Sequence, residues 1–356
     1  MKGKGPKAEI TPGVISGFTP VAGRGQEITP GVISARPPWS LLRMRQSPLM
    51  RDLVAETTFG VSNLIQPIFI VEGMAGSELI TGLGDNARLG ESAALDVIAK
   101  DIDAGVRQFL LFAVPTAKGT TTLNFDHASR ATAAIKKKFG SQLNLWVDVC
   151  LCSSTEHGHC AILDTKGGID LGPTLDALSK MAVRVADAGA DGASPSDMMD
   201  GRTAHIRAAL DAAGHSRVPV MSYSTKFASQ MYGPFREAAA SAPQFGDRKH
   251  YQIDVRSRRD AIAASLRCAD EGADLLMVKP GMTSIDLIAP ITEMTGKPVG
   301  AYQVSGEYAS LVLLAERGLT NFDAALIETL HVFRRAGAAY VITYGARRVH
   351  ALGFGA

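Results

Sequence analysis

Two lysines follow apolar runs of this chain, and that position makes them candidates for covalent chemistry. DLLMVKPGM (274–282) is apolar through Val278 and then places Lys279 before a proline, and SYSTKFASQ (222–230) places Lys226 after a second run. Burial and a neighbouring ammonium group both lower a lysine pKa from its reference of about 10.4. A neutral amine can attack a ketone and form a Schiff base. The alternatives are that Lys279 reaches out of the strand end or pairs with a carboxylate, and that Lys226 caps the next helix.

A second group of reactive side chains lies in one short segment, DVCLCSSTEHGHC (148–160). It contains three of the four cysteines, Cys150, Cys152 and Cys160. In a reducing compartment such a cluster indicates metal or redox chemistry, and thiolates suit Zn²⁺. Three protein ligands leave a fourth position open, as in catalytic zinc sites. His157 and His159 could be ligands, acid–base groups or packing residues, and three free buried cysteines are the alternative to a metal site.

A basic segment downstream of Lys226 is a candidate lid. It contains Arg236 and then FGDRKHYQ, with Arg248, Lys249 and Gln252. Arginine can hold a carboxylate through two parallel hydrogen bonds. A solvated basic loop is the alternative.

The elements that must position these groups are predicted by recurring apolar runs, mostly continuous as in parallel strands covered on both faces. The eight runs are LIQPIFIV (64–71), QFLLFAV (108–114), LNLWVDVCL (143–151), DGASPS (191–196), VPVMSYS (218–224), DLLMVKP (274–280), PVGAYQV (298–304) and YVITY (340–344). Four junctions, DAGVRQFLLF, DAGADGAS, DEGADLLMV and RAGAAYVIT, have a glycine that suits the left-handed end of a helix. The pattern predicts an α/β fold, a (β/α)8 TIM barrel, rather than a doubly wound sheet, since no GxGxxG follows the first strand.

Active sites of this fold lie at the carboxyl ends of the strands. The polar residues expected there, besides the cysteines and lysines, are Asp148, Ser196, Asp197, Ser305 and Tyr344. The barrel prediction therefore directs both lysines toward one shared mouth.

The overall composition excludes several classes of protein. The chain has 356 residues, with Lys+Arg 37 against Asp+Glu 35 and a formal charge of +2. This balance favours neither a nucleic-acid partner nor an anionic membrane. No apolar run approaches the roughly 20 residues of a membrane helix, and no apolar signal segment is found at the start, so we expect a cytoplasmic protein.

The N-terminal segment differs from the rest. Residues 1–38 are rich in Gly and Pro and contain the octapeptide EITPGVIS twice, at 9–16 and 27–34. We predict an extended arm over residues 1–46, either disordered in the monomer or in contact with a partner subunit, and a catalytic barrel over 47–356.

Seven motifs together resemble one family. DVCLCSSTEHGHC, SPSDMMDGR, SYSTKFASQMYGPFREA, FGDRKHYQ, LLMVKPGM, AYQVSGEYA and RRAGAAYVITY are similar, in order, to porphobilinogen synthase, also called 5-aminolevulinate dehydratase. The resemblance covers about residues 37–356. It implies a zinc-dependent hydro-lyase that joins two molecules of 5-aminolevulinate into porphobilinogen with loss of two waters, an early step of tetrapyrrole and heme biosynthesis.

The resemblance also implies roles for single residues. Lys279 matches the lysine that binds the A-side substrate, and Lys226 matches its P-side partner. The three cysteines match zinc ligands, and Asp148 a carboxylate near metal and substrate. Arg236, Arg248 and Gln252 match lid residues around the A-side carboxylate. Ser305 and Tyr344 match P-side carboxylate contacts, and Ser196 and Asp197 match polar groups lining the pocket.

Two features depart from the family. Many bacterial relatives have a glutamate for an allosteric Mg²⁺ where this chain has Ala264, so that metal site is in doubt. Family members usually assemble as homo-octamers of arm-clasped dimers, and the duplicated octapeptide could alter that assembly.

Two other functions compete with this one. A class I Schiff-base aldolase would need one lysine and no cysteine loop. A zinc-buffering or scaffold protein would bind metal without forming an imine.

Overall fold

The computed structural model describes residues 41–352, and internal contacts divide the chain after Ala55 into two units. The described part of the first unit holds a 3-10 helix η1 (Leu41–Arg45) and a short helix α1 (Pro48–Leu53). Ser47 caps α1, since its hydroxyl accepts the Met50 N–H at 3.1 Å. The two copies of EITPGVIS lie outside the described residues. The limit predicted between arm and barrel, after residue 46, stays a prediction.

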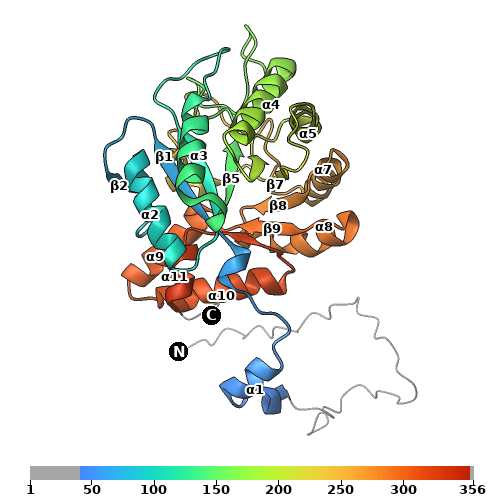
Figure 1. The fold of residues 1–356 in the computed structure, drawn as a ribbon. Coiled ribbons are helices and arrows are strands. Elements are labelled where there is room, and N and C mark those ends of the chain that lie inside the picture. The colour runs from blue at the N-terminus through green and yellow to red at the C-terminus, as the bar shows by residue number, and fades with distance from the viewer. Residues whose placement is uncertain (1–40, 353–356) are drawn as a thin grey trace, which may run out of the picture. The chain divides into compact units, whose positions relative to one another are not determined.

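The second unit is a barrel of parallel strands (Figure 1). Its eight strands are β1 (Leu64–Val71), β4 (Gln108–Val114), β5 (Asn144–Val149), β6 (Gly192–Pro195), β7 (Met221–Lys226), β8 (Leu275–Lys279), β9 (Val299–Tyr302) and β10 (Val341–Ile342). They run in the order β6-β5-β4-β1-β10-β9-β8-β7. A parallel bridge between Ala193 and Val220 brings β6 to the start of β7 and closes the ring. The predicted (β/α)8 fold is confirmed.

Helices lie around these strands (Figure 1). They are α2 (Glu91–Asp103), α3 (Asp126–Phe139), α4 (Leu171–Asp187), α5 (Arg202–Ala212), α6 (Gly233–Ala238), α7 (Arg258–Asp270), α8 (Ile288–Thr295), α9 (Ser305–Glu316), α10 (Phe322–Arg335) and α11 (Ala346–Ala351). Short 3-10 helices complete the unit, namely η2 (Val61–Asn63), η3 (Gly140–Gln142), η4 (Gln230–Tyr232) and η5 (Met282–Leu287).

Most of the strands are continuous apolar runs, because helices cover one face and the barrel core covers the other. All six residues of β7 are buried, and β8 is buried from Leu276 to Lys279. The four predicted helix-end glycines have positive φ, at 89° for Gly105, 95° for Gly189, 94° for Gly272 and 97° for Gly337. Only glycine adopts this conformation without a Cβ penalty, so each can end a helix and turn the chain into the next strand.

Each predicted run contains a strand, with two differences. The run at 218–224 becomes β7 only from Met221, and β7 then extends to Lys226. An antiparallel hairpin of β2 (Ser77–Leu79) and β3 (Ala87–Leu89) beside β1 was not predicted, because strands of three residues with a single buried side chain, Leu89, make no apolar run.

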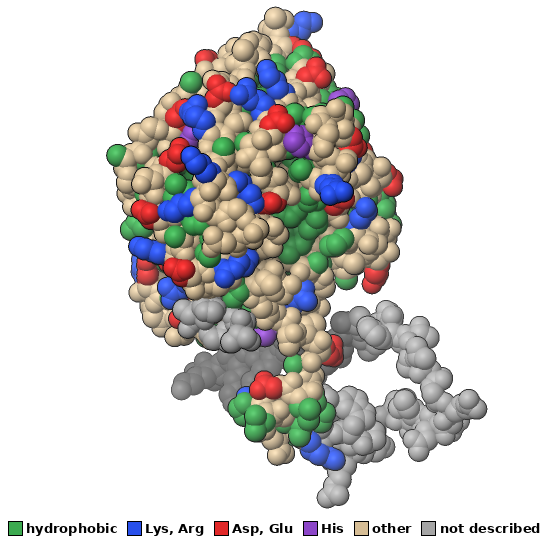
Figure 2. Space-filling view, viewed as in Figure 1, with side chains coloured by type: hydrophobic (Ala, Val, Ile, Leu, Met, Phe, Trp, Pro, Cys, Tyr) green, Lys and Arg blue, Asp and Glu red, His purple; other side chains and the backbone are tan. Residues whose placement is uncertain are grey.

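The charged side chains agree with the balanced composition. On the face of the barrel unit in Figure 2, basic and acidic groups are interspersed. Within residues 41–352, none of the helices combines the length and apolarity needed to cross a membrane.

Candidate active site

The two lysines end neighbouring strands and face the same mouth. Lys226 and Lys279 are the last residues of β7 and β8, and they are direct partners in the parallel register. Both side chains are buried. Burial, and then the positive charge of Lys226, hold the pKa of Lys279 well below its usual value. Lys226 Nζ donates a hydrogen bond to the Ser196 carbonyl oxygen.

The three cysteines converge on one point of the loop after β5. Their Sγ atoms all lie within 4.8 Å of one another, and the Cys150 and Cys152 sulfurs are 3.4 Å apart. A tetrahedral zinc with Zn–S bonds of about 2.3 Å needs sulfurs roughly 3.8 Å apart, so the donor set and its spacing fit a metal of this kind. Hydrogen bonds from Cys150 and then Cys152 lower the pKa of Cys160 well below its usual value, which favours one thiolate in the group.

The two histidines of this loop are engaged away from the thiols. His159 Nδ1 lies 3.2 Å from the Tyr251 hydroxyl, and its Nε2 lies 3.0 Å from the Phe245 carbonyl oxygen. His157 Nδ1 accepts the His159 backbone N–H at 3.1 Å. In this arrangement His159 joins the cysteine loop to the lid.

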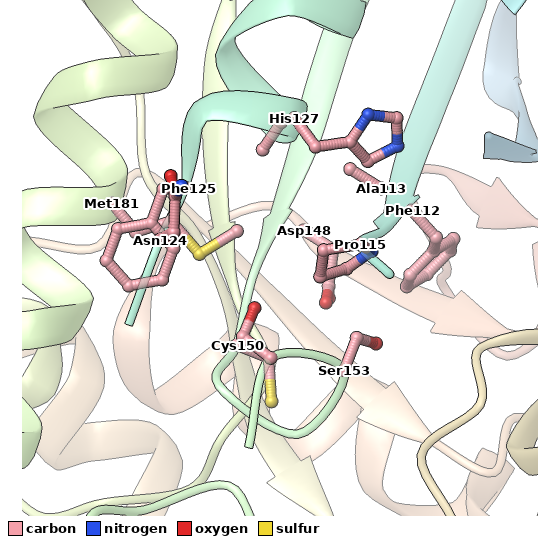
Figure 3. A pocket seen from close by; sticks show the side chains of 12 residues that line it. Phe112, Ala113, Pro115, Asn124, Phe125, His127, Asp148, Cys150, Ser153 and Met181 are labelled. Carbon is pink, nitrogen blue, oxygen red and sulfur yellow. The ribbon is translucent and has the colours of Figure 1, made fainter. Parts of the chain in front are cut away.

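Asp148 stands where β5 meets the cysteine loop. In Figure 3, Asp148, Cys150 and Ser153 gather on one side of a pocket, away from Phe125. One oxygen of the half-buried Asp148 carboxylate is buried and unpartnered. Burial raises the pKa of Asp148 to about 6, although a hydrogen bond with Ser196 and the charges of both lysines oppose that rise. The carboxyl group can therefore hold or release a proton near neutral pH.

Asp197 has a different environment from its neighbour Ser196. Its Oδ2 accepts the Met199 N–H at 2.8 Å, and its Oδ1 lies 3.6 Å from Nε of the fully buried Arg202. Burial raises the pKa of Asp197 to about 6, and the positive charge of Arg202 opposes that rise. These contacts turn the Asp197 carboxylate toward the protein.

The lid residues lie over the cysteine loop. Arg248 is buried and donates to the Gly158 carbonyl at 2.8 Å and to the Ser241 carbonyl. Gln252 is also buried, and both polar atoms of its amide are unpartnered. Arg236 is half-buried, 5.8 Å from the centre of the Tyr232 ring. A buried amide without partners is costly, and a polar ligand would satisfy it.

The last two predicted residues follow β9 and β10. Ser305 Oγ accepts the Phe235 N–H at 3.1 Å, which joins the start of α9 to the lid helix α6. The Tyr344 hydroxyl lies 3.4 Å from the Tyr302 hydroxyl. The structure thus brings lysines, cysteines, lid and these hydroxyls to the carboxyl ends of the strands.

Comparison with known proteins identifies the family. The family model described as delta-aminolevulinic acid dehydratase matches residues 40–352. The chain belongs to the delta-aminolevulinic acid dehydratase family. As a member it is an enzyme, a hydro-lyase of porphyrin and heme biosynthesis.

Several relatives of this dehydratase align over most of their length. Delta-aminolevulinic acid dehydratase of Helicobacter pylori is 40% identical over 314 residues, covering 87% of this chain and 97% of that protein. The Synechocystis enzyme of the same name is 41% identical over 312 residues, covering 86% and 95%. A crystal structure of the Toxoplasma gondii dehydratase, or porphobilinogen synthase, with the reaction product porphobilinogen has a TM-score of 0.85 at 38% identity, covering 90% of this chain and 92% of that one.

Sequence reasoning missed the aromatic residues around Lys279 of this dehydratase. The Lys279 nitrogen lies 4.1 Å from the Tyr302 ring centre and 4.9 Å from those of Tyr223 and Phe235. The Tyr223 ring lies near both amines, since Lys226 Nζ is 5.7 Å from the same ring centre. Their positions in the sequence could have indicated them, because Tyr223 precedes Lys226 by three residues and Tyr302 ends β9.

Arg202 was also missed. It donates to the carbonyls of Met199 at 2.9 Å and Tyr223 at 3.0 Å, and so ties the loop after β6 to β7. Ala264, the position at which the family resemblance implies a glutamate, is buried on α7, and its side chain offers no ligand atom.

Proposed function

We propose that this dehydratase binds two molecules of 5-aminolevulinate as Schiff bases, one on Lys279 and one on Lys226. The observation that carries the proposal is the pairing of the two lysines at the ends of β7 and β8, with the Lys279 pKa lowered by burial and by Lys226. A class I aldolase needs one such lysine, and family membership also disfavours that alternative.

The lysines account for the loss of two waters. Each amine adds in its unprotonated form to a substrate ketone, and the resulting carbinolamine expels the former ketone oxygen as water to leave an imine. A protonated imine withdraws electrons from the adjacent carbon, so that carbon can lose a proton and become a nucleophile. Both lysines return as free amines when the C–C and C–N bonds of the pyrrole have formed.

The lid and the two hydroxyls would hold the substrate carboxylates. We assign the A-side carboxylate to Arg236, Arg248 and Gln252, because the Gln252 amide and the Nε atoms of both arginines are buried and unpartnered. We assign the P-side carboxylate to Ser305 and Tyr344. Carboxylates fixed at both ends of the mouth place the two ketones against the two amines, which lowers the entropic part of the barrier.

A metal ion would be held by Cys150, Cys152 and Cys160, and we propose that it is zinc. Zinc bound by three thiolates offers a Lewis-acidic position that can orient a substrate amine or polarise a carbonyl. Asp148 faces this region, and its carboxyl group can take a proton from the substrate amine and return it. Ser196 hydrogen-bonds the Asp148 carboxyl group, and Asp197 would act as a positioning residue through Arg202.

We further propose a cytoplasmic homo-octamer with no nucleic-acid or membrane partner, and no allosteric Mg²⁺ site at Ala264. Support comes from the balanced charge and the family resemblance. Sedimentation of a chain lacking residues 1–35 tests the arm: the distribution of oligomers should shift, and an unchanged profile would remove the arm from the assembly.

A pyrrole assay with borohydride trapping tests the proposed function. With 5-aminolevulinate the protein should make porphobilinogen, and borohydride should reduce an imine to a stable adduct on Lys279 that mass spectrometry locates. Lys279→Ala should lose turnover, whereas Lys180→Ala, which removes an exposed lysine of α4, should keep it. Full turnover by Lys279→Ala would overturn the assignment.

A further inference from the structure

One buried carboxylate behind the barrel mouth has no part in the steps above. Glu307 is 3% exposed and lies in the first turn of α9, two residues after Ser305. Its Oε1 accepts the N–H groups of Met282 at 2.8 Å and Thr283 at 3.3 Å. Its Oε2 accepts the Val304 N–H at 2.9 Å. One side chain therefore joins two loops that follow different strands.

Both loops carry residues of the proposed site. Met282 follows Lys279 by three residues, and Val304 directly precedes Ser305. The turn between Lys279 and Met282 is held against the same segment, because the Gly281 N–H donates to the Tyr302 carbonyl at 2.7 Å. A Cβ on Gly281 would lie 2.9 Å from that oxygen, so the two loops are in close contact.

Helix capping explains only part of this arrangement. An acidic residue in the first turn that accepts the N-cap N–H stabilises a helix, and this accounts for the bond to Val304. The bonds to Met282 and Thr283 cross to another β/α unit and do nothing for α9. Burial raises the pKa of Glu307 to about 7, and the backbone N–H groups of both loops oppose that rise.

We propose that Glu307 is a positioning residue that holds the loop after Lys279 against the loop before Ser305. It thereby sets the distance between the imine-forming amine and the group that contacts the other substrate's carboxylate. This inference rests on the proposed function of Lys279 and Ser305. Glu307 itself touches no reacting atom.

Glutamine at this position should break the connection while keeping the shape. The carboxylate offers an acceptor to each loop, whereas the amide has one acceptor oxygen and an NH₂ group that would face a backbone N–H. One loop therefore loses its anchor. Displacement of a reacting group by about 1 Å can cost roughly a hundredfold in rate.

The experiment compares Glu307→Gln with Asp274→Asn. Asp274 directly precedes β8, at the end of that strand away from Lys279, and its carboxylate accepts the Val220 N–H at 2.8 Å. Asp274→Asn therefore also replaces a carboxylate that accepts a backbone N–H, but at the opposite end of β8. For each protein, four quantities are measured: the melting temperature, the rate of borohydride trapping at Lys279 with 5-aminolevulinate, kcat per folded protein, and KM.

Glu307→Gln should lower the trapping rate at Lys279 and kcat by about tenfold or more, and Asp274→Asn should leave both within about twofold. If Glu307→Gln does not fold, Glu307→Asp replaces it, because it keeps the charge but is one methylene too short to reach both loops. A folded Glu307 variant with wild-type trapping and kcat would overturn the inference, as would an equal loss in Asp274→Asn. Failure of the wild type to trap substrate on either lysine would instead overturn the proposed function.

Discussion

Replacing the buried Arg202 by methionine should destabilise the barrel strongly and so test the role given to Asp197. Methionine preserves much of the volume but removes the guanidinium, which lies 3.6 Å from the Asp197 carboxylate and donates to carbonyls on β7 and on the loop after β6. Arg202→Met therefore leaves a carboxyl group buried without its cation, together with two carbonyl oxygens that lose a donor.

The cost follows from these contacts. Removing one partner of a buried ion pair costs about 3–5 kcal/mol, which includes part of the penalty for the unpaired carbonyls. For a domain of this size, about 1 kcal/mol lowers the melting temperature by a few degrees, so the expected fall is roughly 10 °C. Trapping at Lys279 should also slow, because one of the carbonyls belongs to Tyr223, whose ring lies near both lysine nitrogens.

Denaturant unfolding is the assay, with Arg267→Met as the matched control. Arg267 pairs with Asp200 at 2.6 Å, but the two side chains are 39% and 73% exposed, and such surface pairs contribute about 1 kcal/mol or less. Adding Asp197→Asn to Arg202→Met should recover part of the loss, since the unpaired acid is then absent. An Arg202→Met protein no less stable than Arg267→Met would refute this reasoning.

Two further predictions concern the lysines and the metal. Lys226→Met removes a positive charge that lowers the Lys279 pKa, so that pKa should rise. The pH of half-maximal trapping at Lys279 should therefore move upward. An unchanged pH profile would mean that the two amines do not interact. A chelator should remove most activity, and zinc should restore it. Joint Cys→Ala changes at 150, 152 and 160 should abolish that recovery. The control is Cys268→Ala, which removes a buried cysteine of α7 outside the cluster and should keep the recovery. Full activity without metal would exclude the thiols as catalytic ligands.

Much of the fold could be predicted from local patterns. Each strand of the barrel lies within or overlaps a predicted apolar run, because most parallel strands covered on both faces are apolar along their length. β7 is the exception, since its buried residues include Ser222, Ser224 and Thr225. The glycines before four strands have the expected positive φ, because that backbone conformation penalises any Cβ. The β2–β3 hairpin has neither signal and was missed.

The candidate site was predictable where one short segment holds a whole group. Cys150, Cys152 and Cys160 lie in one loop, so their spacing indicated a metal site before any coordinates. The lysines were assigned to one mouth because all parallel strands of a barrel end on the same side. Their direct register across β7 and β8 did not follow from spacing.

The sequence by itself determined the barrel, its family and the chemical types at its mouth, because periodicity, glycine junctions and motifs are properties of neighbouring residues. Only the tertiary structure decided what surrounds those groups. The rings around Lys279 come from different strands and the lid, and Arg202 turns Asp197 toward the protein. Glu307 joins the start of its own helix to Met282 and Thr283, which lie 25 and 24 residues away along the chain. Desolvation and hydrogen bonding act between atoms that are close in space, and folding alone brings such distant residues together.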